Sequence, residues 1–153
     1  MLRRVLLKVL VRAASAWAER EEAKALRAGT PLDVTQLADA ARIGVAYASR
    51  IRLQRVDRMP WPLPRRAADF LERRGVIPAR IAGLTLRYAI FIREDSWADC
   101  RLLAHELAHT AQYERLGGFR PFLTRYLEEW WTAGYPHGEL EREARRAAHD
   151  IRQ

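Results

Sequence analysis

The first part of the chain carries apolar residues at helical spacing. Between residues 2 and 17, one side of a helix would hold Leu2, Val5, Leu6, Val9, Leu10, Ala13 and Trp17, and the opposite side Arg4, Lys8 and Arg12. This pattern predicts an amphipathic helix within residues 1–28. Such a helix either packs its apolar side against the rest of the protein, which we favour, or lies on an anionic membrane surface. A cleavable signal peptide fits less well, because Lys8 and Arg12 interrupt the apolar stretch.

Two segments have the pattern of β-strands. Residues 50–56 alternate charged and apolar side chains, which suits a strand with one buried face. Residues 84–92 are rich in β-branched and aromatic residues and follow Gly83, so we expect one strand there. Between them, the Pro-rich residues 59–64 interrupt regular structure, and residues 65–74 predict a short helix that ends at Gly75.

Three helices are predicted in the second half of the chain. Residues 97–116 contain no Pro or Gly, Ser96 can cap their start, and Gly117 can end the helix. The next helix buries a stripe of three aromatic residues: Phe122, Tyr126 and Trp130. After a break at residues 134–136, a last helix has five apolar residues on one side: Leu140, Ala144, Ala147, Ala148 and Ile151. With 153 residues, 49% of them hydrophobic, these elements predict one compact α+β domain spanning residues 1–153.

The segment His105-Glu106-Leu107-Ala108-His109 indicates a specific chemistry. Residues four apart stack on one face of a helix, so the imidazoles of His105 and His109 can bind one metal ion. In this H-E-x-x-H arrangement two neutral histidines bind Zn²⁺, and the glutamate, here Glu106, activates a water for attack on a carbonyl. Gln112 lies about one turn beyond His109, where it either orients a ligand or is only a polar residue at the edge of the helix.

A catalytic zinc ion usually takes three protein ligands, so a third is needed. Glu141 and Glu143 flank the apolar stripe of the last helix symmetrically, and helical phase alone does not choose between them.

The combination of His-Glu-Leu-Ala-His with a later Glu-x-x-Ala helix resembles the zincin metallopeptidases, specifically their gluzincin branch. Residues 83–148 are similar to small bacterial predicted peptidases that carry His-Glu-Leu-Ala-His-x-x-Gln. The resemblance implies a zincin-like fold with the metal site in residues 83–153 and a small sheet beside the metal helix. It also implies that Glu141 is the third ligand, that the strand before the metal helix receives the substrate backbone, and that a peptide or protein is hydrolysed.

The chain departs from the family pattern at Arg145, where membrane-associated relatives with Glu-x-x-Ala-Asp have an acid. Arg145 could pair with the Glu141 carboxylate, which supports the ligand or competes with the metal for it. Attack on an amide also needs a hydrogen-bond donor for the developing oxyanion. Tyr135 and His137 lie in the loop before the last helix, and either could serve.

The net charge of +8 raises nucleic acid as a partner, but the basic excess lies outside the half that carries the motif and no nucleic-acid-binding signature is present. Cys100, the single cysteine, cannot form an internal disulfide, which fits a cytoplasmic location, and we expect it to be a small core residue. The principal hypothesis is therefore a zinc metallopeptidase. The alternatives are a zinc-stapled binding module without turnover and a basic protein that binds nucleic acid or a membrane surface.

Overall fold

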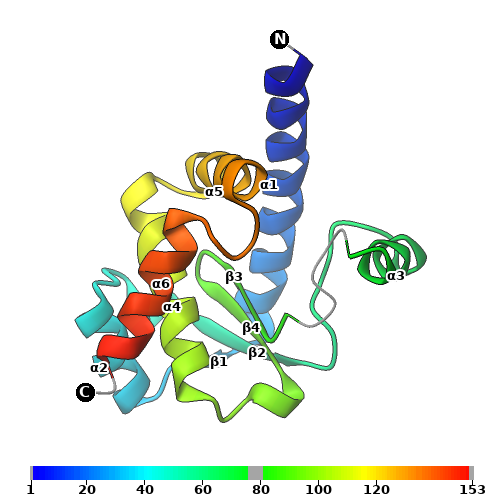
Figure 1. Cartoon of the computed structure of the whole chain (residues 1–153). Coiled ribbons are helices and arrows are strands. Elements are labelled where there is room, and N and C mark those ends of the chain that lie inside the picture. Colours follow the sequence, from blue (N-terminus) through cyan, green and yellow to red (C-terminus); the bar gives the residue numbers. More distant parts are fainter. Residues whose placement is uncertain (1, 76–80, 152–153) are drawn as a thin grey trace.

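The computed structural model describes residues 2–75 and 81–151, which form six α-helices and a four-stranded mixed sheet (Figure 1). In chain order the elements are α1 (Leu2–Ala28), β1 (Thr30–Pro31), α2 (Val34–Ile43), η1 (Ala48–Arg50), β2 (Arg52–Val56), α3 (Arg65–Arg73), β3 (Gly83–Leu86), β4 (Ala89–Arg93), η2 (Glu94–Ser96), α4 (Cys100–Leu116), α5 (Phe119–Ala133) and α6 (Glu139–Asp150). The predicted α+β class is confirmed. Within the described residues, no helix combines the length and the apolar composition needed to cross a membrane.

The sheet has the strand order β1-β2-β4-β3, with β2 and β4 parallel and the other pairs antiparallel. The central strand β4 is buried from Ala89 to Ile92 because helices cover both faces. On one face, Ile90 and Ile92 join a core cluster with Leu107 of α4 and residues of α2. On the other, Phe91 joins a cluster with residues of α1, α5 and α6. Strand β3 lies at the edge of the sheet beside α4.

The single strand predicted over residues 84–92 is wrong, because these residues form the hairpin of β3 and β4. Leu84 pairs with Phe91, and the chain reverses at Arg87, which has a φ of 55°. The buried carboxylate of Glu22 on α1 accepts hydrogen bonds from the Arg87 guanidinium at 2.6 and 2.9 Å and from the Tyr88 N–H at 3.1 Å. Thr110 of α4 donates to the Arg87 carbonyl at 2.8 Å. Contacts from two distant helices thus stabilise a turn that has no glycine.

The predicted metal helix begins later than expected. α4 starts at Cys100, and its N-cap is Asp99, whose carboxylate accepts hydrogen bonds from the N–H groups of Arg101 and Leu102. Ser96, the predicted cap, ends the short η2 instead. The C-terminus is as predicted, with Gly117 in the left-handed conformation at φ 93°. Cys100 is exposed, so its assignment to the core is wrong.

The predicted packing of the N-terminal apolar stripe is also wrong over its first turns, although Trp17 at the end of the stripe is partly buried against the core. α1 extends to Ala28, and its N-terminal end projects beyond the other elements (Figure 1, dark blue). The residues of α1 that pack inward form a different line: Val11, Ser15, Ala18, Glu22 and Ala25. The predicted apolar positions Val5, Leu6, Val9 and Leu10 are exposed.

Candidate metal centre

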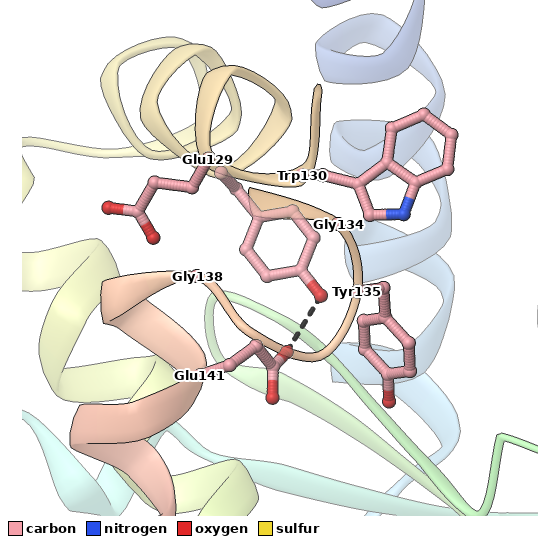
Figure 2. A pocket seen from close by; sticks show the side chains of 7 residues that line it. Glu129, Trp130, Gly134, Tyr135, Gly138 and Glu141 are labelled. Atoms are coloured by element: carbon pink, nitrogen blue, oxygen red, sulfur yellow. Dashed lines mark hydrogen bonds between the residues drawn. The ribbon is translucent and has the colours of Figure 1, made fainter. Parts of the chain in front are cut away.

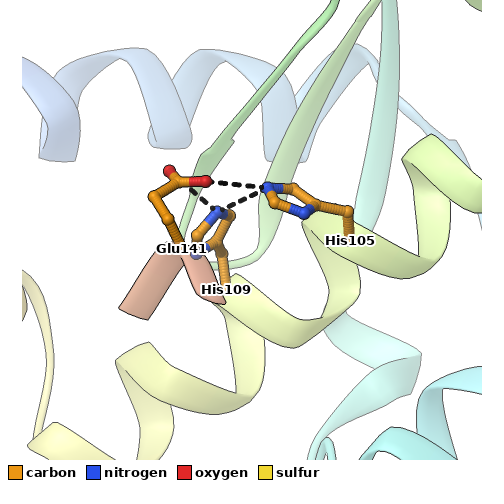
Figure 3. A group of neighbouring side chains, drawn as sticks. All are labelled: His105, His109 and Glu141. Atoms are coloured by element: carbon orange, nitrogen blue, oxygen red, sulfur yellow. Dashed lines mark hydrogen bonds and ion pairs between the residues drawn. The ribbon is translucent and has the colours of Figure 1, made fainter. Parts of the chain in front are cut away.

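The three predicted metal ligands meet where α6 packs along α4. His105 and His109 lie one turn apart on α4, and Glu141 lies in the first turn of α6. Figure 3 shows both imidazole rings and the Glu141 carboxylate converging on one point. The two Nε2 atoms are 3.0 Å apart, and the carboxylate oxygens lie 3.3 Å from Nε2 of His105 and 3.5 Å from Nε2 of His109. Glu141, not Glu143, therefore faces the histidines.

These separations suit a zinc ion. A tetrahedral zinc with ligands at about 2.0–2.1 Å holds neighbouring ligand atoms roughly 3.3–3.4 Å apart. Two imidazoles and a carboxylate are also a donor set that zinc commonly takes in catalytic sites. Among the described residues, His105, His109 and Glu141 are the His, Cys, Asp or Glu side chains that lie close enough together to share an ion. They supply three ligands. A fourth position would be left for water or substrate.

Gln112 orients His109. The Oε1 atom of Gln112 lies 2.8 Å from Nδ1 of His109, and its amide nitrogen donates to the Leu140 carbonyl at 2.9 Å and to Glu143 at 3.1 Å. Because the amide oxygen only accepts, the contact places a proton on Nδ1 and leaves Nε2 free to bind a cation. Gln112 is 1% exposed, so of the two alternatives the ligand-orienting role is the one the geometry supports.

Tyr126 of α5 contacts Glu141, the predicted third ligand. Its hydroxyl donates to Oε1 of Glu141 at 2.7 Å, drawn as the dashed line in Figure 2. Burial and the nearby Glu141 carboxylate raise the pKa of Tyr126 well above 10, so the phenol stays protonated and remains a donor. The sequence placed Tyr126 in a packing stripe with Phe122 and Trp130. Phe122 is buried as predicted, but Trp130 is 37% exposed, so the stripe is wrong at that position.

The contacts within the cluster favour the ionised form of Glu141 and the positively charged form of His109. Burial is the largest single influence on Glu141 and would raise its pKa, but hydrogen bonds with His105, His109 and Tyr126 lower the pKa well below its usual range. For His109, burial again has the largest influence and lowers the pKa, yet the Glu141 hydrogen bond and the charge of Glu106 raise it overall. The site therefore attracts positive charge to Nε2, either a proton or a metal ion.

Glu106, the predicted general base, is buried against β3. The Thr85 hydroxyl donates to its Oε2 at 2.7 Å and also lies 3.0 Å from its backbone carbonyl. Gly83 lies directly against the same side chain. A Cβ at position 83 would collide with the Glu106 carboxylate, so the close approach requires glycine. Gly83 leaves space for the Glu106 carboxylate, and the Thr85 hydroxyl holds that carboxylate by a hydrogen bond.

Contacts from α5 and α4 position the ligand helix. The N-cap residue of α6 is Gly138, which cannot cap the helix with a side chain, and the Glu129 carboxylate of α5 instead accepts from the Leu140 N–H at 2.8 Å. Glu143 pairs with Arg115 of α4 through two contacts of 2.5 and 2.8 Å. Glu143 therefore joins α6 to α4 from outside the triad.

An open pocket of about 590 Å³ lies against the triad, lined by His105, Glu106 and Glu141 together with Gly83 of β3. Tyr135 lines both this pocket and the small cavity of Figure 2. Burial, then the carboxylates of Glu141 and Glu106, raise the pKa of Tyr135, so its hydroxyl can donate at neutral pH.

The other two residues predicted to act near the metal are His137 and Arg145. His137 is exposed, and the side chains that line the pocket do not include it. Arg145 lines the pocket, but its guanidinium donates to the Pro136 carbonyl at 2.8 Å instead of to Glu141. The structure thus brings together His105, Glu106, His109, Tyr135 and Glu141, and leaves His137 apart.

Sequence reasoning missed the roles of Thr85, Gly83, Tyr126 and Glu129 at this site. Helical or strand periodicity gives no signal for them, because each acts on a residue far away in the chain. Comparison with known proteins finds no match to any family model, curated protein or solved structure.

Proposed function

We propose that this protein is a zinc-dependent metallopeptidase with a zincin-like, gluzincin-type site. His105, His109 and Glu141 bind the ion, and Glu106 is the general base. The observation that carries the proposal is the spacing of the three ligand groups, 3.0, 3.3 and 3.5 Å between atoms, which fits one tetrahedral zinc. The gluzincin resemblance of residues 105–112 and 141–144 is independent support.

Two features favour catalysis over a zinc site that only joins helices. Structural zinc sites are typically closed by four protein ligands, whereas the described residues supply three here. The open pocket also reaches His105 and Glu141, so a substrate has access to the fourth position. We therefore prefer turnover to the zinc-stapled binding module.

The side chains have distinct tasks in the proposed reaction. Bound zinc would act as a Lewis acid and make water a better nucleophile at neutral pH. Glu106 accepts a proton from the attacking water and returns it to the leaving amine. Tyr135 donates a hydrogen bond to the carbonyl oxygen as negative charge develops there. Gln112 and Tyr126 hold His109 and Glu141 in place.

The edge strand β3 is the proposed site for the substrate backbone. It pairs with β4 on one side, and its Gly83 lines the pocket beside Glu106. An extended peptide added along this edge would run past the triad, with main-chain hydrogen bonds giving affinity. The zincin resemblance implies the same placement.

The proposal is tested with a diverse peptide library and mass spectrometry of the products. We expect new termini with the zinc-loaded protein, none after a chelator, and recovery when zinc is restored. Cleavage that continues in excess chelator would contradict the proposal, as would an intact library in the presence of the zinc-loaded protein.

Replacing Thr85 should separate catalysis from metal binding. Thr85→Val keeps the shape but removes the hydrogen bond to Glu106, and a hydrogen bond to a charged group is worth about 1.5–3 kcal/mol. We expect kcat to fall roughly tenfold or more, with KM and zinc content nearly unchanged, and Thr85→Ser to restore most of the rate. Equal kcat values for Thr85→Val and the wild type would show that Thr85 does not position the base.

A further inference from the structure

The N-terminal half of α1 presents an apolar surface that no described residue covers. Its side chains are large and well exposed: Val5 is 54% exposed, Leu6 45%, Val9 59% and Leu10 43%. Exposed apolar residues that are contiguous usually mark an interaction site. This surface, Val5, Leu6, Val9 and Leu10, is called the apolar stripe below.

The stripe faces away from the body of the protein. At about 100° per residue, these four residues cover an arc of roughly 140°. The inward line of the same helix, Val11, Ser15, Ala18 and Glu22, is centred on the opposite side. A flat surface could therefore meet the whole stripe while the sheet and the other helices lie on the far side of α1.

Basic residues border the stripe. Arg12 and Lys8 are exposed about 20° and 60° round the helix from Val5, Arg4 is exposed on the far side, and residues 1–18 contain no Asp or Glu. Pairing two copies through the stripe would bring these basic groups together without acidic partners. Nucleic acid would attract the basic flank but would leave the apolar side chains in water. A partner with an anionic surface above an apolar interior would match both the basic flank and the apolar stripe.

We propose that α1 docks this protein on an anionic lipid bilayer, lying in the surface plane with the stripe in the acyl boundary. Lys8 and Arg12 then lie on the flank that faces the lipid headgroups, where long basic side chains can reach phosphate. Each basic residue at such a surface changes the partition coefficient by roughly fivefold, and salt weakens the effect. This inference does not depend on the proposed peptidase activity.

The test is co-sedimentation of the full chain with vesicles made of equal parts phosphatidylcholine and phosphatidylglycerol. We expect binding at low salt, much weaker binding at high salt, and little binding to phosphatidylcholine alone. The combined variant V5Q/L6Q/V9Q/L10Q should lower the partition coefficient at least about tenfold. R4Q/K8Q/R12Q should lower it by roughly 25-fold or more, because Lys8 and Arg12 each contribute about fivefold. Gln is a good helix former and these positions are exposed, so folding is expected to survive.

A matched control, R42Q/R142Q/R146Q, makes the same change in net charge on α2 and α6, away from α1. It should bind vesicles like the wild type. The proposal would be overturned if the control lost binding as strongly as R4Q/K8Q/R12Q, or if the four-Gln variant bound normally. Sedimentation velocity tests whether the stripe instead binds a second copy of the chain. A wild-type dimer that becomes a monomer in V5Q/L6Q/V9Q/L10Q would show this and would overturn the proposal.

Discussion

Glu106→Gln should abolish peptide hydrolysis while the protein keeps its zinc. The amide cannot accept a proton from water, and general-base catalysis contributes about 10²–10⁴-fold to a rate, so kcat should fall by a factor in that range. Gln has the shape of Glu, and its amide oxygen can accept the Thr85 hydrogen bond that Glu106 accepts at 2.7 Å. The buried side chain should therefore fit without a change in fold. The measurement is kcat on a peptide found by the library experiment, together with zinc content.

Glu128→Gln is the matched control, because Glu128 is exposed on α5 and the substitution makes the same change in charge. It should have wild-type kcat. Hydrolysis by Glu106→Gln at the wild-type rate would rule out Glu106 as the base, whether or not zinc is bound.

Glu141→Gln should weaken zinc binding by more than about a hundredfold, because loss of a residue that merely supports a ligand already costs 10–100-fold in affinity. The carboxamide keeps the size of the side chain and can still accept from Tyr126, so the loss reports on the ligand itself. Zinc affinity is measured by competition with a chromophoric chelator.

Glu143→Gln is the comparison, since it removes one carboxylate two residues away on the same helix. Glu143 contacts Arg115 and Gln112 rather than the histidines, so its substitution should change zinc affinity by less than about tenfold. The reverse order of the two variants would move the third ligand to Glu143 and invalidate the assignment.

Local sequence predicted the histidine spacing and the C-terminal end of α4, because this information lies within one element, but it missed the N-cap. The four-residue spacing of His105 and His109 and the terminal Gly117 depend only on helix geometry, and the structure has both. The third ligand is different. Glu141 and Glu143 have equivalent phase, and only the resemblance to gluzincins chose between them before the structure placed Glu141 beside the histidines.

Residues that act across the fold could not be predicted in this way. The hairpin turn at Arg87 has no Gly, Asn or Asp, and it depends on Glu22, which is distant in the sequence. Likewise, Thr85 looks like an ordinary strand residue until β3 lies beside Glu106. The N-terminal stripe illustrates the opposite error, because helical periodicity shows that a face is apolar but not what covers it.

Zinc-edge X-ray absorption of the protein loaded with one equivalent of zinc tests the central claim most directly. The account predicts two imidazole nitrogens and carboxylate or water oxygens at about 2.0–2.2 Å, with one imidazole lost in His105→Ala. A sulfur ligand near 2.3 Å, which would implicate Cys100, or a protein that retains no zinc after gel filtration, would contradict it.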